Sequence, residues 1–240
     1  MNYLLIGGIV IFVLFIVVAM VISSTAFSRF KGVVEELKYS INSSYITAYQ
    51  FAQMIRDRFF DNSLAIITRK GQFSDAYDYK SNTIILSEET VDDKTVSALG
   101  VVCHEFGHAM QRKNKSKNFL KWVKLRKFVS VASSFIAPFM ISGLVMLFFE
   151  SLTINYVGVL LIALAFSLFL LLLVFKFRLL KVEKEASRLG MNMLRELEVL
   201  DDVEMKNAKR VLDAAFMTYL GDFFRALLGW TMLTRKSDKP

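Results

Sequence analysis

The stretch Val101–Gln111 reads VVCHEFGHAMQ and holds both histidines of the chain, His104 and His108. The two are four residues apart, so on a helix they project side by side from one face. Two imidazoles placed in this way can bind one zinc ion. Glu105 is rotated by about 100° from His104, beside such an ion, where it can take a proton from a water molecule. The pattern predicts a catalytic metal site on one helical turn, and the alternative is a pair of buried, hydrogen-bonded histidines.

A catalytic zinc site usually has three protein ligands and a water molecule. The chain has no third histidine, so the third ligand must be a carboxylate or Cys103. Cys103 directly precedes His104 and points off the ligand face, which is more typical of a small buried side chain. The polar segment Lys181–Gly190, KVEKEASRLG, offers Glu183 and Glu185. These lie about 200° apart on a helix, so both cannot face one metal, and the spacing alone does not choose between them. The alternative is a solvated charged face.

The rest of the chain separates into apolar runs and charged segments. It has 240 residues, 54% of them hydrophobic, and a mean hydropathy of +0.42. Three uncharged runs, Leu4–Ile22, Phe128–Phe149 and Asn155–Phe175, are long enough to cross a bilayer core of about 30 Å as helices. The start of the chain lacks basic residues, which favours an uncleaved first span over a signal peptide. The short gap between the last two runs predicts a helical hairpin, and Pro138 predicts a kink in the second run.

The placement of the basic residues predicts an orientation. The net charge is +8, and Lys and Arg gather after the first run, before the second at 112–127, and after the third at 176–184. Loops on the cytoplasmic side of a membrane usually carry an excess of Lys and Arg. This rule predicts that the N-terminus lies outside and that residues 23–127 and 176 onward lie in the cytoplasm. The cluster at 112–127 also predicts contact with anionic lipid headgroups. Because it abuts a span and no nucleic-acid motif occurs, we expect no nucleic-acid binding. The single cysteine fits a reducing compartment.

Between the apolar runs, the patterns predict helices and a small sheet. Residues 30–60 have helical spacing, and Thr83–Leu86 is a short β-prone run. Thr90, with Asp93 three residues later, matches a capping box, so we expect a helix from about Val91 through the histidines. A separate polar helix is expected from about Glu183. The segment Val211–Leu233 predicts an amphipathic helix that packs on the protein or lies on the membrane, with a fourth span as the alternative.

These patterns predict a mostly α-helical integral membrane protein. It has about three transmembrane helices and a small zincin-like α+β catalytic region that contains a short sheet. The expected regions are an N-terminal transmembrane helix, a cytoplasmic catalytic region with the HEFGH helix, a transmembrane helical hairpin, and cytoplasmic helices that carry the candidates for the third ligand and the amphipathic helix. Their bounds are 1–27, 28–127, 128–178 and 179–240.

Two motifs resemble a known family. The segments Leu86–Gln111 and Val182–Leu194, with the two apolar runs between them, resemble the bacterial YugP-type membrane zinc metallopeptidases. The pairing of the motifs is also similar to HtpX-type membrane proteases. The resemblance covers the chain from the first span to about Trp230. It implies that Glu183 is the third zinc ligand and that Ser187 supports the ligands.

The chain departs from this family in two places. Lys184 and Glu185 stand where an aromatic residue and an aspartate are usual. The stretch Asp75–Tyr79 lacks the histidine and the proline of the DHYDP-like sequence that such proteins often have before the strand. Any catalytic help from that histidine is therefore missing here.

Motif and resemblance together predict a membrane-embedded, zinc-dependent endopeptidase with Glu105 as general base and Zn²⁺ as cofactor. Its substrates would be peptides or membrane proteins, cleaved on the cytoplasmic side of the cell membrane. An inactive membrane scaffold with a structural metal site is the alternative, and the intact Glu105 argues against it. A metal transporter would need polar residues within its spans, and these spans offer almost none.

Two smaller features complete the predicted site. Thr83–Leu86 is a candidate edge strand that binds an extended peptide by strand addition, and a purely structural strand is the alternative. A group that stabilises the oxyanion is also expected. Tyr219, Arg188 and Arg225 are candidates for it, although packing and surface roles account for each of them at least as well.

Overall fold

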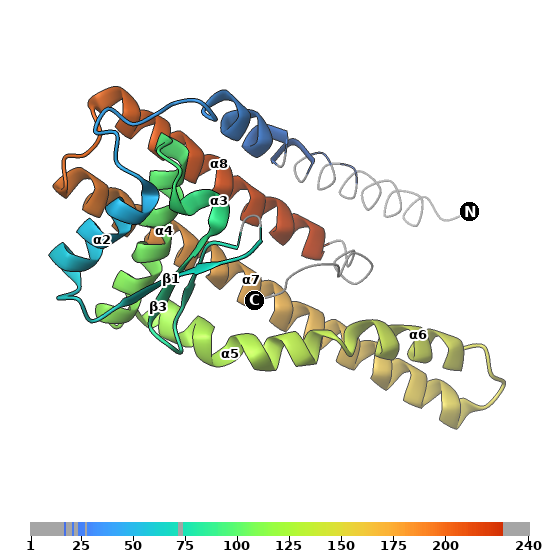
Figure 1. The fold of residues 1–240 in the computed structure, drawn as a ribbon. Helices are drawn as coiled ribbons and strands as arrows, with labels where there is room; N and C mark the ends of the chain where they lie inside the picture. Colours follow the sequence, from blue (N-terminus) through green and yellow to red (C-terminus); the bar gives the residue numbers. More distant parts are fainter. Residues whose placement is uncertain (1–16, 18–20, 22–23, 27, 72–73, 228–240) are drawn as a thin grey trace. The chain divides into compact units, whose positions relative to one another are not determined.

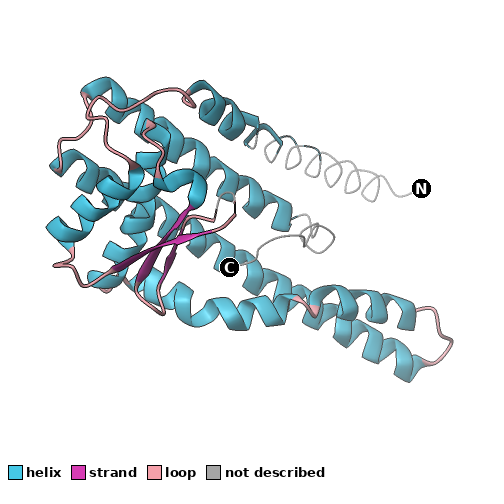
Figure 2. Cartoon of the chain, in the orientation of Figure 1, coloured by secondary structure: helices cyan, strands magenta, loops and turns pink. Residues whose placement is uncertain are grey.

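The structure is a computed structural model that describes residues 17, 21, 24–26, 28–71 and 74–227. Contacts divide the chain into two compact units. One, the polar unit, is built from Ser24–Leu120 and Lys181–Tyr219. The other, the apolar unit, is built in its described part mainly from Lys121–Leu180. As predicted, the described part of the chain is mostly helical and contains one small sheet (Figure 2). The predicted first span, Leu4–Ile22, lies almost entirely outside the described residues.

The polar unit combines helices with a three-stranded sheet (Figure 1). A helix at 28–36 is followed by α2, β1, β2, β3, α3 and α4, and later by the end of α7 and most of α8. Their bounds are α2 Ala48–Phe59, β1 Ala65–Arg69, β2 Ala76–Asp78, β3 Thr83–Ser87, α3 Glu88–Val91, α4 Val96–Lys113, α7 Leu152–Glu196 and α8 Asp202–Leu227. The core of this unit includes Phe51, Ile55, Leu99, Phe106 and Leu194, all fully buried.

The strand β3 is the middle strand of the sheet. The order is β1-β3-β2, with β1 parallel and β2 antiparallel to β3. All five residues of β3 are buried. The proposed edge role of Thr83–Leu86 is therefore wrong, since both of its edges are already paired. A short apolar run carries no information about which strands flank it.

The helix that carries the histidines starts later than its sequence pattern indicated. It is capped by Thr95, whose hydroxyl accepts a hydrogen bond from the backbone N–H of Ala98 at 3.2 Å. The predicted cap at Thr90 is wrong because Ser87 caps the separate one-turn helix α3 and accepts from the N–H of Thr90. The helical pattern at 30–60 is also interrupted, between residue 36 and α2. Thr47 and Gln50 form the capping box that starts α2.

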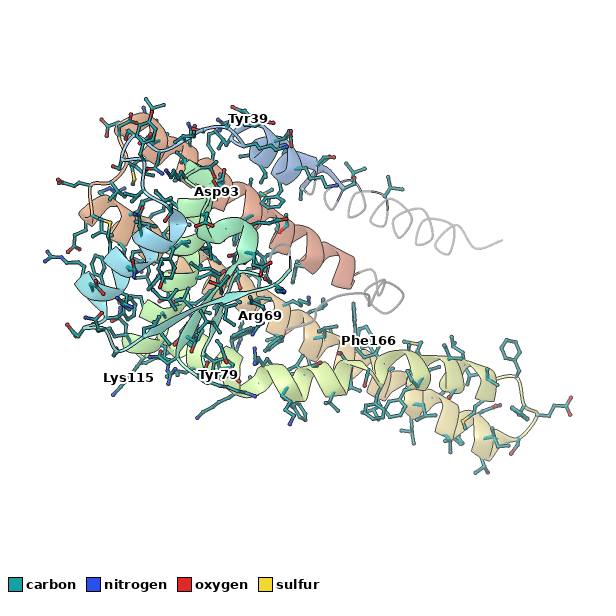
Figure 3. All side chains as sticks on the ribbon, in the orientation of Figure 1. Tyr39, Arg69, Tyr79, Asp93, Lys115 and Phe166 are labelled. Carbon is teal, nitrogen blue, oxygen red and sulfur yellow. The ribbon has the colours of Figure 1, made fainter. Side chains whose placement is uncertain are left out.

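The apolar unit consists mainly of α5 (Lys117–Ser133), α6 (Ile136–Met146) and the first part of α7. Two helical segments, Lys117–Met146 and Leu152–Glu196, are long and apolar enough to cross a membrane. Exposed apolar side chains such as Phe166 project from them (Figure 3). The first segment breaks at 134–135, four residues before Pro138. The break fits the predicted kink, since a proline clashes with the carbonyl group four residues earlier.

The second segment does not end where its charged part begins. One continuous helix, α7, runs for 45 residues from Leu152 to Glu196. The expected separate polar helix at Glu183 is therefore the continuation of the apolar helix, because no glycine or proline occurs between Gly158 and Gly190. The last helix, α8, begins nine residues before the predicted Val211, and the end of the predicted amphipathic segment lies outside the described residues.

Candidate metal centre

Two helices bring three candidate ligands together. His104 and His108 lie on α4, and Glu183 lies on α7. One donor atom from each of them lies within 4.8 Å of the other two. Oε2 of Glu183 is 3.2 Å from Nε2 of His104 and 3.5 Å from Nε2 of His108. Glu183 is only 5% exposed, so its carboxyl group faces the imidazoles rather than solvent.

The close approach of α4 and α7 depends on two glycines. A methyl group on Gly107 would lie 2.7 Å from the carbonyl carbon of Ala186. A methyl group on Gly190 would lie 2.7 Å from the carbonyl carbon of Cys103. The two helix backbones therefore touch at two places on α4, next to His108 and next to His104, and the first contact on α7 lies one turn after Glu183. The glycine within HEFGH thus sets how closely the carboxylate approaches the imidazoles.

Both imidazole rings are held through their other nitrogen. Nδ1 of His104 lies 3.1 Å from the hydroxyl oxygen of Ser187, the residue that the resemblance implied as a support. Nδ1 of His108 lies 3.0 Å from the amide oxygen of Gln111. In each ring Nε2 then faces Glu183, and hydrogen bonds to Nδ1 of this kind are usual for zinc-binding histidines.

The electrostatics of the three donors also fit a cation. Burial acts to lower the pKa of His108, but the hydrogen bond to Glu183 and the charges of Glu183 and Glu105 together outweigh it and raise the pKa above its usual value. Burial likewise acts to raise the pKa of Glu183, but the hydrogen bonds from His104 and His108 and the charges of these two rings together outweigh it and lower the pKa. The pocket therefore favours a carboxylate with positive charge beside it. Two imidazole nitrogens and a carboxylate oxygen are a donor set that suits Zn²⁺.

Glu105 lies beside these donors without being one of them. Its Oε2 accepts a hydrogen bond of 2.8 Å from the backbone N–H of Tyr77, in the edge strand β2. Burial raises the pKa of Glu105, and the neighbouring histidines partly oppose this effect. A carboxyl group with a raised pKa can exchange a proton closer to neutral pH than an exposed glutamate.

The two other candidate ligands from the sequence lie elsewhere. Oε2 of Glu185 accepts hydrogen bonds from Gln111 at 3.0 Å and from the Ser116 hydroxyl at 2.7 Å. Cys103 is fully buried, and its thiol donates to the carbonyl oxygen of Gly100 at 3.1 Å. Burial raises the pKa of this thiol, which disfavours the thiolate that binds metals.

A neighbouring arginine holds the β2–β3 hairpin against α4. Nη1 of Arg112 donates to the carbonyl oxygen of Tyr79 at 2.6 Å, to the Tyr77 hydroxyl at 3.3 Å and to Oδ1 of Asn82 at 3.2 Å. The sequence had placed Arg112 in the basic cluster at 112–127 that contacts lipid. The side chain of Arg112 is half-buried and bound to the hairpin, and lipid contact of the cluster stays a prediction.

Sequence reasoning missed Gln111 and Tyr77. Gln111 could have been found, because it follows His108 by three residues and so lies on the same helical face. Tyr77 could not, because it contacts Glu105 through its backbone N–H, which every residue except proline has. Of the oxyanion candidates, Arg188 is exposed on α7, and the side chain of Arg225 lies outside the described part of the chain.

Comparisons with known proteins agree with these observations. The model of a family described as "putative neutral zinc metallopeptidase" matches residues 12–235. A protein of Bacillus subtilis (strain 168), named "Putative membrane protease YugP", is 27% identical over 151 residues. The matched part is 63% of this chain and 63% of the relative, so it spans a little less than two thirds of the relative's length. No solved structure matches the chain.

Proposed function

Because the chain belongs to the family described as "putative neutral zinc metallopeptidase", we propose that it is a membrane-anchored zinc endopeptidase. His104, His108 and Glu183 are the zinc ligands, and Glu105 is the general base. The observation that carries the proposal is the convergence of these three donors within 4.8 Å of one another, with the half-buried Glu105 beside them.

Zinc bound by this donor set would supply Lewis-acid activation of a water molecule and of the scissile carbonyl group. The residues of the chain do the rest. Glu105 takes a proton from the attacking water and passes it to the leaving amine. The N–H of Tyr77 holds one oxygen of this carboxyl group and fixes its direction. Ser187 and Gln111 keep the two imidazoles turned toward Glu183.

The proposed setting is the cytoplasmic face of the cell membrane, with multiple spans. Support comes from the two helical segments long and apolar enough to cross a membrane and from the printed name of the relative. The basic residues that flank the apolar runs favour the cytoplasmic side. On α7, Glu183 follows the last residue of the apolar run, Phe175, by eight residues. Membrane proteins and their cytoplasmic tails are therefore the proposed substrates.

The experiment that tests this function compares zinc content with proteolysis. The full chain is purified in detergent without chelator, its zinc per chain is measured, and cleavage of a fluorogenic peptide library is followed. Wild type should hold about one zinc ion per chain, as expected for a single catalytic site. Glu105→Gln should keep the zinc and lose about 10²–10⁴-fold in rate, since it removes only the proton acceptor.

Glu88→Gln, on the exposed side of α3, is the matched control and should behave as wild type. Unchanged proteolysis by Glu105→Gln would overturn the proposed mechanism. Zinc without any proteolysis in wild type would instead favour the inactive scaffold with a structural metal.

A further inference from the structure

Gln111 is a fully buried polar residue in which both ends of the amide have partners. Its oxygen lies 3.0 Å from Nδ1 of His108, which precedes it by one helical turn. Its nitrogen donates to the carbonyl oxygen of Val182 at 2.8 Å and to Oε2 of Glu185 at 3.0 Å. The side chain thus connects a candidate ligand on α4 with the backbone and a side chain of α7.

These partners allow only one orientation of the amide. The Val182 carbonyl and the Glu185 carboxylate are both acceptors, so the NH₂ group must face them. The reversed amide would turn its oxygen toward two acceptors in a buried site, where an unsatisfied polar group costs about 1–3 kcal/mol. The amide oxygen therefore faces His108. Since this oxygen can only accept, Nδ1 of His108 must carry the hydrogen.

We propose that Gln111, held in place by Glu185, is a positioning residue that keeps the Nε2 lone pair of His108 open for the metal. A neutral imidazole with hydrogen on Nδ1 has its lone pair on Nε2. This nitrogen lies 3.5 Å from Oε2 of Glu183, within the group of three donors. The inference rests on the proposed function. It adds that metal binding also depends on Gln111, which is not itself a ligand.

Glu185 acts on the site only through Gln111, whose amide it holds. Its Oε2 is fixed from two sides, by the Gln111 amide and by the hydroxyl of Ser116, which precedes α5. Its contribution to the site therefore passes through the orientation of Gln111. This gives a role to a carboxylate that the sequence offered only as a competing ligand or as a solvated charge.

The first test is the zinc affinity of the full chain in detergent, measured by competition with a chelator. Gln111→Leu should bind zinc about 10–100-fold more weakly, the usual effect of losing a partner behind a metal ligand. Leucine has a similar volume and adds no buried polar atom. Gln53→Leu makes the same chemical change at a half-buried position on α2 and should leave the affinity unchanged.

The second test reads the imidazole directly. The chain has only two histidines, so ¹⁵N-histidine labelling of the zinc-loaded protein gives one set of ring signals for each. In wild type the Nδ1 proton of His108 should exchange slowly with solvent. In Gln111→Leu this proton should exchange fast, while the His104 signal, which depends on Ser187, should stay unchanged. Ser187→Ala should have the opposite effect on the two rings. A general loss of folding would disturb both rings, which separates positioning from a structural role.

Glu185 supplies a second pair of variants in case Gln111→Leu does not fold. Glu185→Gln keeps an acceptor for the Gln111 amide and should keep the affinity, whereas Glu185→Leu should weaken it. Equal affinities for wild type, Gln111→Leu and Glu185→Leu would overturn the inference. So would zinc bound through Nδ1 of His108. A wild-type chain that binds no zinc would overturn this inference together with the proposed function. Weaker zinc binding by Gln111→Leu, combined with unchanged proteolysis by Glu105→Gln, would refute the proposed mechanism alone.

Discussion

Helices touch at glycine in both units, but different side chains flank the two contacts. In the apolar unit, a methyl group on Gly143 of α6 would lie 2.7 Å from the carbonyl oxygen of Gly158 on α7. In the polar unit, Gly107 of α4 meets Ala186 on the later part of the same helix α7. Around Gly143 the packed side chains are apolar, such as Ile162. Gly107 is followed directly by His108, and its partner Ala186 lies one turn after Glu183.

The difference shows what a close helix contact does and what it does not do. A glycine lets two backbones approach, and in a membrane environment the close packing at such contacts helps to hold helices together. In the polar unit the same approach brings a buried carboxylate within 3.2 Å and 3.5 Å of two imidazole nitrogens. The same kind of close helix contact therefore occurs in both units, and the side chains next to the contact determine whether it forms a metal site. Substitutions at the two contacts should separate these contributions.

The largest effect is expected for Gly107→Ala. The new methyl group would overlap the backbone of Ala186, which cannot yield as a flexible side chain could. The helices must separate, and a displacement of about 1 Å can cost 10²-fold in rate. We expect zinc binding and proteolysis to be lost together, as measured by metal content and peptide cleavage. Gly100→Ala on the same helix is the control, because its methyl group would meet only ordinary contacts at 3.8 Å or more. Normal activity of Gly107→Ala would refute the importance of this contact.

Loss of the carboxylate at this contact should come next. Glu183→Ala removes one of the three donors. Loss of a residue that only supports a ligand typically weakens metal binding by about 10–100-fold, so the zinc affinity of Glu183→Ala should fall by more than that. Glu185→Ala, two residues away on the same helix, should have the smaller effect. Chelator competition on both variants measures the order. The reverse order would make Glu185 the third ligand.

The sequence predicted one half of this site from local spacing and could not predict the other. His104, Glu105 and His108 lie within one and a half turns of a helix, so periodicity alone places them together. The choice between Glu183 and Glu185 depends on how α7 packs against α4. The two helices meet where Gly107 contacts Ala186. No local pattern contains such a contact, and only the family resemblance indicated Glu183.

The fold shows the same limit. The mostly helical content and the small sheet are confirmed, because helix and strand periods are local properties. The central place of Thr83–Leu86 in the sheet depends on strand pairing and was missed. The start of α4 was also misplaced, because Thr90 and Thr95 both fit a cap. Only the contacts of Ser87, which begins a separate turn of helix, distinguish them.

A methyl group at the other glycine contact should affect stability and leave the metal site unchanged. Gly143→Ala would overlap the carbonyl oxygen of Gly158, at a cost of about 1–3 kcal/mol, typical of an overpacked contact. Thermal unfolding in detergent should show the loss, and zinc affinity should match wild type. Gly32→Ala, in the helix at 28–36, has nothing within 4 Å of its new methyl group and is the control. Weaker zinc binding by Gly143→Ala would show that the two contacts are coupled.

The smallest effect is expected at the start of α4, where the two units also differ. Thr95 caps α4 with its hydroxyl, whereas the cap position of α6, Phe135, makes no side-chain hydrogen bond. Thr95→Ala leaves the N–H of Ala98 without this acceptor and should cost about 1 kcal/mol. The histidines lie more than two turns further along the helix, so zinc affinity should not change. Thr95→Ser keeps the hydroxyl and should restore the melting temperature, and a variant that lost zinc while keeping stability would contradict this separation.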